Sequence, residues 1–436
     1  MNQLARLAGD AALREMGMPL RSRTVPSHLK LTGTLDLEIL EAAAAVVQSR
    51  HQALRVAVEY DPEQDTGRMV DQVSMAPNCR VFGGPDVALG DALAQANEWL
   101  TTYFEPTSGN MWRLALVADD RGSETHLFVG VDHLVCDGAS IDIVVRDLAN
   151  AYTSIAANRA LSLPTAPSLL TFAETESRRL ASKETSEDIS RLAGLLAGAS
   201  PSGFADLPLL EPLTVHPVGR TAGFRWIIDA SELDARRKAR LATGSLAYFC
   251  SETLLTAASV ASTFRPLSVI NYSSNRLRRE SRGLVGWLAS PFAFAQRDDA
   301  FTIPGWHRWY NTVALASLPL PLVRARLAPH EADARAMRPS LAIVLDSPSF
   351  ESLEFGPASA RPEFHLAEQA KLWGGPGQRG RILLNVQLIG PEAQVELAFE
   401  EGRFAHAITD AMACALGREL GRRAEYFVAG GEHAHG

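Results

Sequence analysis

The sequence predicts a two-layer α/β protein (α+β, with sheets covered by helices) made of two domains. The chain has 436 residues, which exceeds one domain of ordinary size. Short apolar segments of strand type alternate with longer helical segments in both halves, a pattern typical of sheets covered by helices. Residues 199–219 are rich in Pro, Gly and Ser and predict a linker between domains at 1–198 and 220–436.

The first half predicts strands and helices in alternation. Asp36 is a suitable N-cap for a helix that runs to about Arg50, and Ser140 is the expected N-cap of a later helix. The apolar stripe of that later helix consists of Ile141, Val144, Val145, Leu148 and Tyr152. The other expected elements are strands at 54–58, 111–117 and 126–131 and a helix within 87–104.

The second half continues the alternation after the linker. Residues 302–340 are rich in Pro, Trp and Arg and fit no single element. The expected strands are 224–228, 267–271, 341–345, 382–389 and 395–400, and the expected helices are 246–264 and 403–420.

Composition excludes several classes of function. The formal net charge is −8 and no long basic run is present, so we expect no nucleic-acid partner. No apolar stretch is long enough to span a membrane, and the N-terminus lacks a signal-peptide pattern, so we expect a cytoplasmic protein. The four cysteines lie far apart without metal-ligand spacing, which predicts free thiols and no metal site.

The most informative motif is residues 132–138, which read DHLVCDG and follow the apolar run 126–131. This run predicts a buried strand, and the residues after Gly138 predict a helix. His133 therefore stands at a strand end, where an imidazole that titrates near neutral pH can take a proton from a nucleophile. Asp137 and Gly138 predict a sharp turn.

Five separated segments, taken in order, resemble the condensation-domain superfamily of nonribosomal peptide synthesis, which includes chloramphenicol acetyltransferase and polyketide-associated acyltransferases. Residues 131–140 resemble the family's HHxxxDG block, with Asp132 in place of the first histidine and His133 as the second. The remaining segments are 33–36 with 50–55 (the RHxxLR block), 169–179, 275–276 with 283–287 (the R … VGxF block) and 383–416.

The resemblance implies a fold and an activity. The fold is two chloramphenicol-acetyltransferase-like halves in a V-shaped pseudo-dimer, with an active-site tunnel at their junction. The activity is transfer of an acyl group from a phosphopantetheine thioester on an acyl or peptidyl carrier protein to an amine or alcohol. No permanently bound cofactor is implied. Because the resemblance covers nearly the whole chain, we expect a stand-alone enzyme of natural-product biosynthesis and a monomer.

The resemblance also implies roles for single residues. His133 is the candidate base, and Asp137 pairs with Arg276 to brace the turn that carries it. Gly138 permits the turn, and its amide can face the developing oxyanion. Asp132 is expected to support the site structurally.

Two alternatives stay open at this stage. One is a coenzyme A-dependent O-acyltransferase of the polyketide-associated type. The other is a non-catalytic condensation-like protein that recruits a partner enzyme, which the replacement at Asp132 keeps open.

Overall fold

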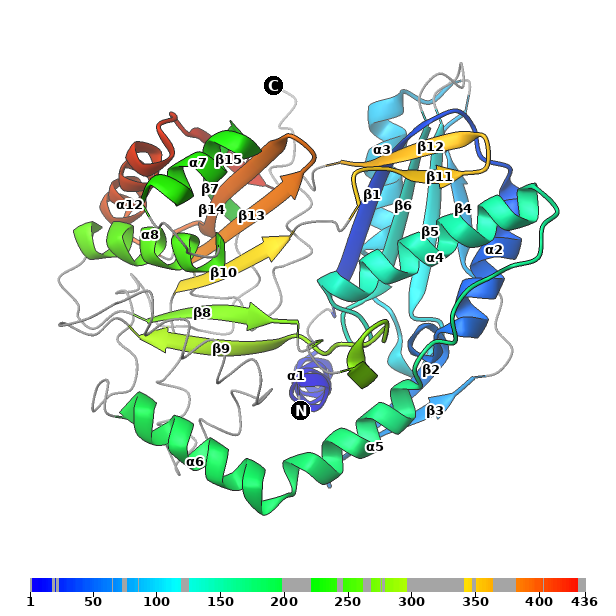
Figure 1. The fold of residues 1–436 in the computed structure, drawn as a ribbon, viewed down its shortest axis with the longest axis horizontal. Helices are drawn as coiled ribbons and strands as arrows, with labels where there is room; N and C mark the ends of the chain where they lie inside the picture. The colour runs from blue at the N-terminus through cyan, green and yellow to red at the C-terminus, as the bar shows by residue number, and fades with distance from the viewer. Residues whose placement is uncertain are drawn as a thin grey trace. The chain divides into compact units, whose positions relative to one another are not determined.

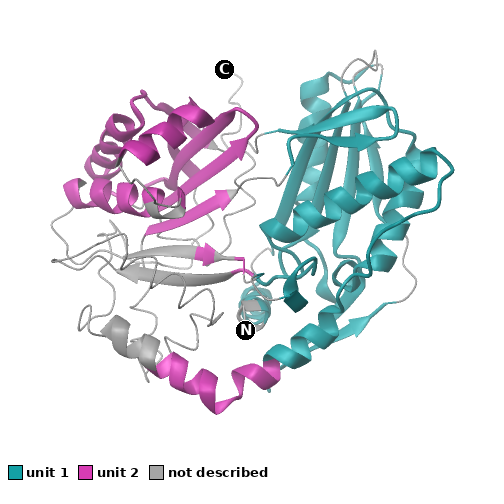
Figure 2. Ribbon diagram, viewed as in Figure 1, with its two compact units in different colours: residues 1–176, 276–288, 348–365 teal, residues 177–275, 289–347, 366–436 magenta. Residues whose placement is uncertain are grey.

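The computed structural model describes most of the chain as two compact units (Figure 2). Unit 1 contains residues 1–176, 276–288 and 348–365, and unit 2 contains the rest. The described residues are 2–17, 20, 23–64, 66–72, 77–84, 86–118, 125–197, 221–240, 246–261, 268–274, 276, 279–295, 341–346, 350–363, 382–402 and 404–429.

Unit 1 is built on a six-stranded mixed sheet with the order β11-β12-β1-β6-β5-β4 (Figure 1). Two further strands, β2 and β3, form a separate antiparallel pair. The strands are β1 Thr24–Thr32, β2 Val56–Asp61, β3 Thr66–Asp71, β4 Cys79–Phe82, β5 Trp112–Ala118, β6 Thr125–Asp132, β11 Leu353–Phe355 and β12 Ala358–Pro362. The helices that begin in this unit are α1 Asn2–Glu15, α2 Leu37–Arg50, α3 Leu89–Leu100, α4 Gly138–Ala156 and α5 Leu169–Leu180. Short 3₁₀ turns lie at Gln52–Arg55, Pro106–Ser108 and Arg279–Ser281.

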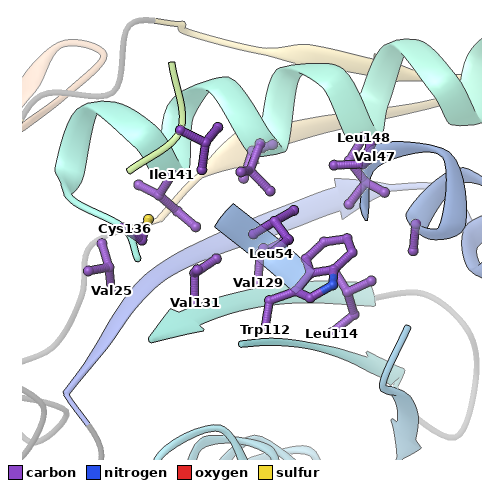
Figure 3. Close-up of a cluster of buried hydrophobic side chains, with 14 of the residues drawn as sticks. Val25, Val47, Leu54, Trp112, Leu114, Val129, Val131, Cys136, Ile141 and Leu148 are labelled. Carbon is purple, nitrogen blue, oxygen red and sulfur yellow. The ribbon is translucent and has the colours of Figure 1, made fainter. Parts of the chain in front are cut away.

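Helices cover both faces of this sheet. The apolar residues of α2 and α4 pack on Trp112 and Leu114 of β5 and on β6 (Figure 3). The alternate residues of β5, Ala115 and Val117, pack against α3 on the opposite face. Because β6 lies between two covered faces, every one of its residues is buried.

Local sequence signals explain where two of these helices begin. The Asp36 side chain accepts a hydrogen bond from the Ile39 amide at 3.1 Å, so the predicted cap of α2 is confirmed. The predicted apolar stripe of α4, from Ile141 to Tyr152, is buried and is also confirmed. The predicted cap of α4 is wrong: Asp137 is the N-cap, and Ser140 lies in the first turn.

Unit 2 is built on a seven-stranded sheet with the order β15-β7-β14-β13-β10-β8-β9. Helices α8 and α12 supply its core together with β7, β10, β13 and β14. The strands are β7 Thr221–Asp229, β8 Ser268–Ser273, β9 Ser290–Ala295, β10 Leu341–Asp346, β13 Ile382–Ile389, β14 Glu392–Glu400 and β15 Glu425–Ala429. Its helices are α6 Lys183–Ala197, α7 Ala230–Arg240, α8 Leu246–Ala261 and α12 His406–Leu420.

The predicted α/β class is confirmed, whereas the V-shaped arrangement of the two halves stays a prediction. The predicted linker at 199–219 and the segment 302–340 lie outside the described residues. Residues 276–288 and 348–365 lie beyond the predicted linker but belong to unit 1. The sequence did not predict that these later segments join the first unit.

Expected absences can be stated for the described part of the chain only. None of its helices is long and apolar enough to cross a membrane. It also holds no group of three or more His, Cys, Asp or Glu side chains placed to bind a metal ion. All four cysteines, Cys79, Cys136, Cys250 and Cys414, are free thiols, as predicted.

Leu148→Ala tests the core between α4 and the sheet. Leu148 is fully buried, so truncation removes apolar contacts and leaves a cavity. We expect the free energy of unfolding, measured by urea denaturation, to fall by about 2–5 kcal/mol. Leu161→Ala is the matched control, because Leu161 is 40% exposed and its loss should change that free energy by less than about 0.5 kcal/mol. Equal effects of the two substitutions would contradict the assignment of this core.

Candidate functional site

His133 lies in a tight turn between β6 and α4. Its backbone amide donates to the carbonyl of Arg23 at 2.6 Å, and the Val135 amide donates to the carbonyl of Asp132 at 3.1 Å. The ring Nδ1 lies 2.7 Å from the carbonyl oxygen of Cys136. A carbonyl can only accept, so Nδ1 carries the proton in this bond. The neutral ring then presents the lone pair of Nε2, which is the position that a general base needs.

The surroundings of His133 favour its neutral form. Burial lowers the pKa of His133 below its usual 6.5, while Asp137 opposes the shift and Arg6 adds to it. The residue as a whole is partly buried in the described structure. Trp287 packs against it with 4.3 Å between ring centroids and an interplanar angle of 41°. The surroundings of His133 thus orient its ring and favour the neutral form.

Asp137 joins the helix to a distant segment of unit 1. Its carboxylate caps α4 by accepting from the Ser140 amide at 2.9 Å. Arg276 contacts both carboxylate oxygens, at 2.8 and 2.9 Å, so the ion pair that the resemblance implies is present. The Leu288 amide donates to Oδ2 of Asp137 at 2.9 Å. Since Asp137 and Arg276 are both largely buried, their attraction is weakly screened.

Ser140 is the centre of a second set of contacts at the same place. Its hydroxyl accepts from Arg276 Nη2 at 2.6 Å and from the Gly286 amide at 3.0 Å. Arg276 Nη2 also lies 3.1 Å from the carbonyl oxygen of Leu284. These contacts hold residues 284–288, and therefore Trp287, next to the His133 turn.

The two glycines near the site, Gly138 and Gly286, differ in the space available for a side chain. A Cβ on Gly286 would lie 2.8 Å from a methyl carbon of Leu288 and 3.0 Å from one of Leu169, so a side chain there would force these leucines to shift. Gly138 has no positive φ, so the predicted need for glycine in the turn is wrong. A Cβ on Gly138 would meet nothing within 4 Å, which leaves open space at the exposed start of α4.

Asp132 is fully buried and pairs with Arg6 of α1. One Asp132 oxygen lies 2.9 Å from Arg6 Nη2, and the other contacts Arg6 Nη1, so the pair is bidentate. The Asp132 carboxylate also accepts from the Leu134 amide at 2.7 Å. These contacts explain the residue that stands in place of the family's first histidine.

Cys136 lies inside the motif but is a core residue. It is fully buried among Val25, Val131 and Ile141, as Figure 3 shows. Burial raises the pKa of its thiol well above the usual value, so the thiol stays protonated and is a poor nucleophile.

The structure brings all five predicted site residues together at the start of α4 in unit 1. Three other residues that contact them were not predicted from the sequence: Arg6, Trp287 and, as a shared hydrogen-bond partner, Ser140. Trp287 stands inside the R … VGxF segment, so its place in that block was a usable signal. Arg6 gave no signal, because nothing in a single arginine near the N-terminus predicts a partner 126 positions later.

Comparison with known proteins shows what this chain is similar to. Residues 21–190 match the family model described as Condensation domain. The predicted resemblance to the condensation-domain superfamily is confirmed.

Among curated relatives, cyclosporin synthetase from Tolypocladium inflatum is 26% identical over 211 residues, 47% of this chain and 1% of the relative. The probable non-canonical nonribosomal peptide synthetase CymA from Salinispora arenicola is 29% identical over 251 residues, 56% of this chain and 3% of the relative. This chain thus matches only a small fraction of the length of each of these relatives.

Solved structures match over nearly the whole chain and show the fold. The starter condensation domain of rhizomide synthetase, in complex with C8-CoA, has a TM-score of 0.71 at 15% identity, covering 95% of this chain and 92% of that one. The X-domain from teicoplanin biosynthesis has a TM-score of 0.70 at 20% identity, covering 96% and 92%. The SgcC5 protein from Streptomyces globisporus has a TM-score of 0.66 at 19% identity, covering 92% and 91%.

Arg276→Gln tests the ion pair under α4. Removal of one partner leaves the Asp137 carboxylate buried without its cation, so we expect a loss of about 3–5 kcal/mol in the free energy of unfolding. Arg282→Gln, at an exposed position of the same segment, should cost less than about 0.5 kcal/mol. In a double-mutant cycle with Asp137→Asn the losses should not add, and strict additivity would count against the pair.

The lowered pKa of His133 predicts a pH dependence of stability. The unfolded chain binds a proton at His133 below about pH 6.5, whereas the folded chain binds it only at lower pH. Stability from this group is therefore complete above about pH 6.5 and is lost as the pH falls towards the folded pKa. We expect His133→Gln to reduce the slope of unfolding free energy against pH in that window, measured by urea denaturation. His406→Gln, at an exposed position on α12, should keep the wild-type slope.

Proposed function

We propose that this chain is a condensation-type acyltransferase of natural-product biosynthesis. It moves an acyl group from a phosphopantetheine thioester to an amine or alcohol, forming an amide or an ester. The observation that carries the proposal is the ring of His133, whose Nδ1 donates to the Cys136 carbonyl and whose Nε2 stays available as a base.

The proposed step balances without a bound cofactor. The amine nitrogen or alcohol oxygen attacks the thioester carbonyl carbon, and His133 Nε2 takes the proton that the nucleophile loses. The carbon–sulfur bond then breaks, the carbonyl re-forms, and the proton passes to the leaving thiolate to give a free thiol. No nucleophilic side chain is needed, because the acyl group is already activated as a thioester. The Gly138 amide, in the first turn of α4 where helix amides lack intrahelical acceptors, is the proposed donor to the oxyanion.

The other site residues hold this base in place. The Asp137–Arg276 pair fixes the start of α4, and Asp132 fixes the strand end before His133. Their proposed contribution is alignment of the base with the reactants, a factor that can supply about 7–11 kcal/mol of a barrier.

The relatives support this class of reaction. The curated relatives that match are nonribosomal peptide synthetases, and the rhizomide starter domain of similar fold was solved with C8-CoA, a thioester. We propose a carrier-protein thioester as the donor, and hence an acyl or peptidyl carrier protein as the partner of a monomeric, cytoplasmic enzyme. A coenzyme A donor is the alternative. Intact-mass spectrometry of the reaction would show which thioester loses its acyl group.

A recruitment role without catalysis is the second alternative. The X-domain from teicoplanin biosynthesis, of similar fold, was solved in complex with OxyB. In this chain the bidentate contact with Arg6 gives Asp132 a structural reason that is compatible with catalysis, so the observations favour the acyltransferase.

His133→Ala tests the proposal directly. We expect the rate of acyl transfer, measured by mass spectrometry with an acylated carrier protein and an amine or alcohol acceptor, to fall by about 10²–10⁴-fold because the base is lost. His406→Ala, which removes an exposed histidine of unit 2, should keep the wild-type rate. An unchanged product yield in folded His133→Ala would exclude the catalytic role and leave the recruitment role.

A further inference from the structure

Helix α1 contacts the His133 site at two separate points. The first is the buried pair between Arg6 and Asp132, the residue directly before His133. The second is a hydrogen bond of 3.3 Å from Gln3 Nε2 to the backbone carbonyl of Trp287, whose ring packs on His133. Arg6 and Gln3 lie three positions apart and so belong to the same side of the helix. One turn of α1 thus reaches both neighbours of the imidazole.

The contact at Asp132 is built for a fixed geometry. Arg6 is 2% exposed and Asp132 is 0% exposed, so water does not screen the pair. Burial alone would lower the pKa of Arg6, but the Asp132 carboxylate outweighs it and the pKa is raised. Arg6 therefore stays charged and holds both oxygens of Asp132.

The fixed carboxylate in turn fixes the His133 turn. One Asp132 oxygen is shared between Arg6 and the Leu134 amide, which lies on the far side of His133 in the sequence. Rotation of this carboxylate would break the bond to Leu134, so the orientation of the turn depends on Arg6. The backbone amide of His133 itself is held by the Arg23 carbonyl.

We propose that helix α1 belongs to the functional site and positions two of its residues. Arg6 positions His133 through Asp132, and Gln3 positions Trp287. The helix, Asn2–Glu15, precedes residues 21–190 that match the family model, so this contribution is additional to the matched segment. The proposal deepens the proposed function, and it depends on that function only for the transfer readout described below.

The charges around His133 predict opposite effects from the two halves of the pair. The charged groups near the ring are Arg6 from α1, Asp132 from β6, Asp137 at the start of α4 and Arg276 bound to Asp137. Asp10 of α1 lies 3.5 Å from Arg6, and Arg23 before β1 interacts with Arg6, Asp10 and Asp132. Removal of the Arg6 cation takes away a positive charge near the ring and favours the imidazolium. Removal of the Asp132 anion takes away a negative charge and disfavours the imidazolium, while Arg6 keeps its contact with Asp10. A purely mechanical role of the pair would not give shifts of opposite sign.

The test measures the reactivity of His133 without any substrate. Full-length protein is treated with diethyl pyrocarbonate, which modifies neutral imidazole, and the rate at His133 is followed against pH by peptide mapping with mass spectrometry. We expect the midpoint of this profile to move to higher pH in Arg6→Gln and to lower pH in Asp132→Asn. Arg14→Gln is the matched control: it lies in the same helix, but its pair with Glu105 is exposed, at 51% and 47%, and the midpoint should not move.

Transfer rates give the second readout. We expect Arg6→Gln to lower the rate constant of transfer by about 10- to 100-fold because the base is misplaced, with little change in KM. Arg6→Lys should recover part of this loss, since it restores the charge without the bidentate fork.

The outcomes separate this proposal from the proposed function. Unmoved midpoints in both folded variants, or shifts of the same sign, would overturn the role of Arg6 even if the enzyme transfers acyl groups. Opposite shifts without transfer activity in the wild-type protein would support positioning and overturn the proposed function. If Arg6→Gln does not fold, Asp132→Asn carries the midpoint test, and Arg6→Lys and Gln3→Ala carry the transfer test. An unmoved midpoint in Asp132→Asn together with wild-type transfer rates in the other two variants would overturn the proposal.

Discussion

The ion pair between Asp137 and Arg276 is the interaction on which the rest of the site depends. It joins two residues 139 positions apart, and it does so under the first turn of α4. Asp137 also caps that helix, and Arg276 also binds the Ser140 hydroxyl and the Leu284 carbonyl. Because each group has several partners, the start of α4 and the segment 276–288, which includes Trp287, form one rigid arrangement around His133.

The DHLVCDG motif places two carboxylates close to His133, yet the surroundings favour the unprotonated form of the ring. Asp132 and Asp137 flank His133 in sequence, and each is paired with its own arginine, Arg6 and Arg276. Two unpaired carboxylates would favour the imidazolium and raise the pKa of His133. With both neutralised, burial is the largest effect and lowers that pKa. The ring thus remains a proton acceptor.

Much of the fold could be predicted because its signals are local. The cap at Asp36, the apolar stripe of α4 and the hairpin of β13 and β14 depend on residues close in sequence, and the structure contains them. The motif residues that act together were predictable for the same reason, helped by the family resemblance. The first strand, β1, was missed because Ser27 interrupts the alternation of Val25, Leu29 and Leu31 and because Pro26 is unusual inside a central strand, although β6 pairs along nearly all of it.

What could not be predicted depends on contacts between distant segments. Serine is a residue type favoured at helix N-caps, but Asp137 is the N-cap of α4. The Ser140 hydroxyl instead accepts hydrogen bonds from Arg276 and from the Gly286 amide. Strands β11 and β12 extend the sheet of unit 1 from residues 353–362, and only the pairing of β12 with β1 shows where they belong.

Unit 1 is completed by two segments from late in the chain, 276–288 and 348–365, and this affects its folding during synthesis on the ribosome. During synthesis, Asp137 cannot bind its partners until residues 276–288 have left the exit tunnel, and the sheet of unit 1 cannot be completed until residues 353–362 have done so. The final folding of unit 1 must therefore wait for the synthesis of much of unit 2.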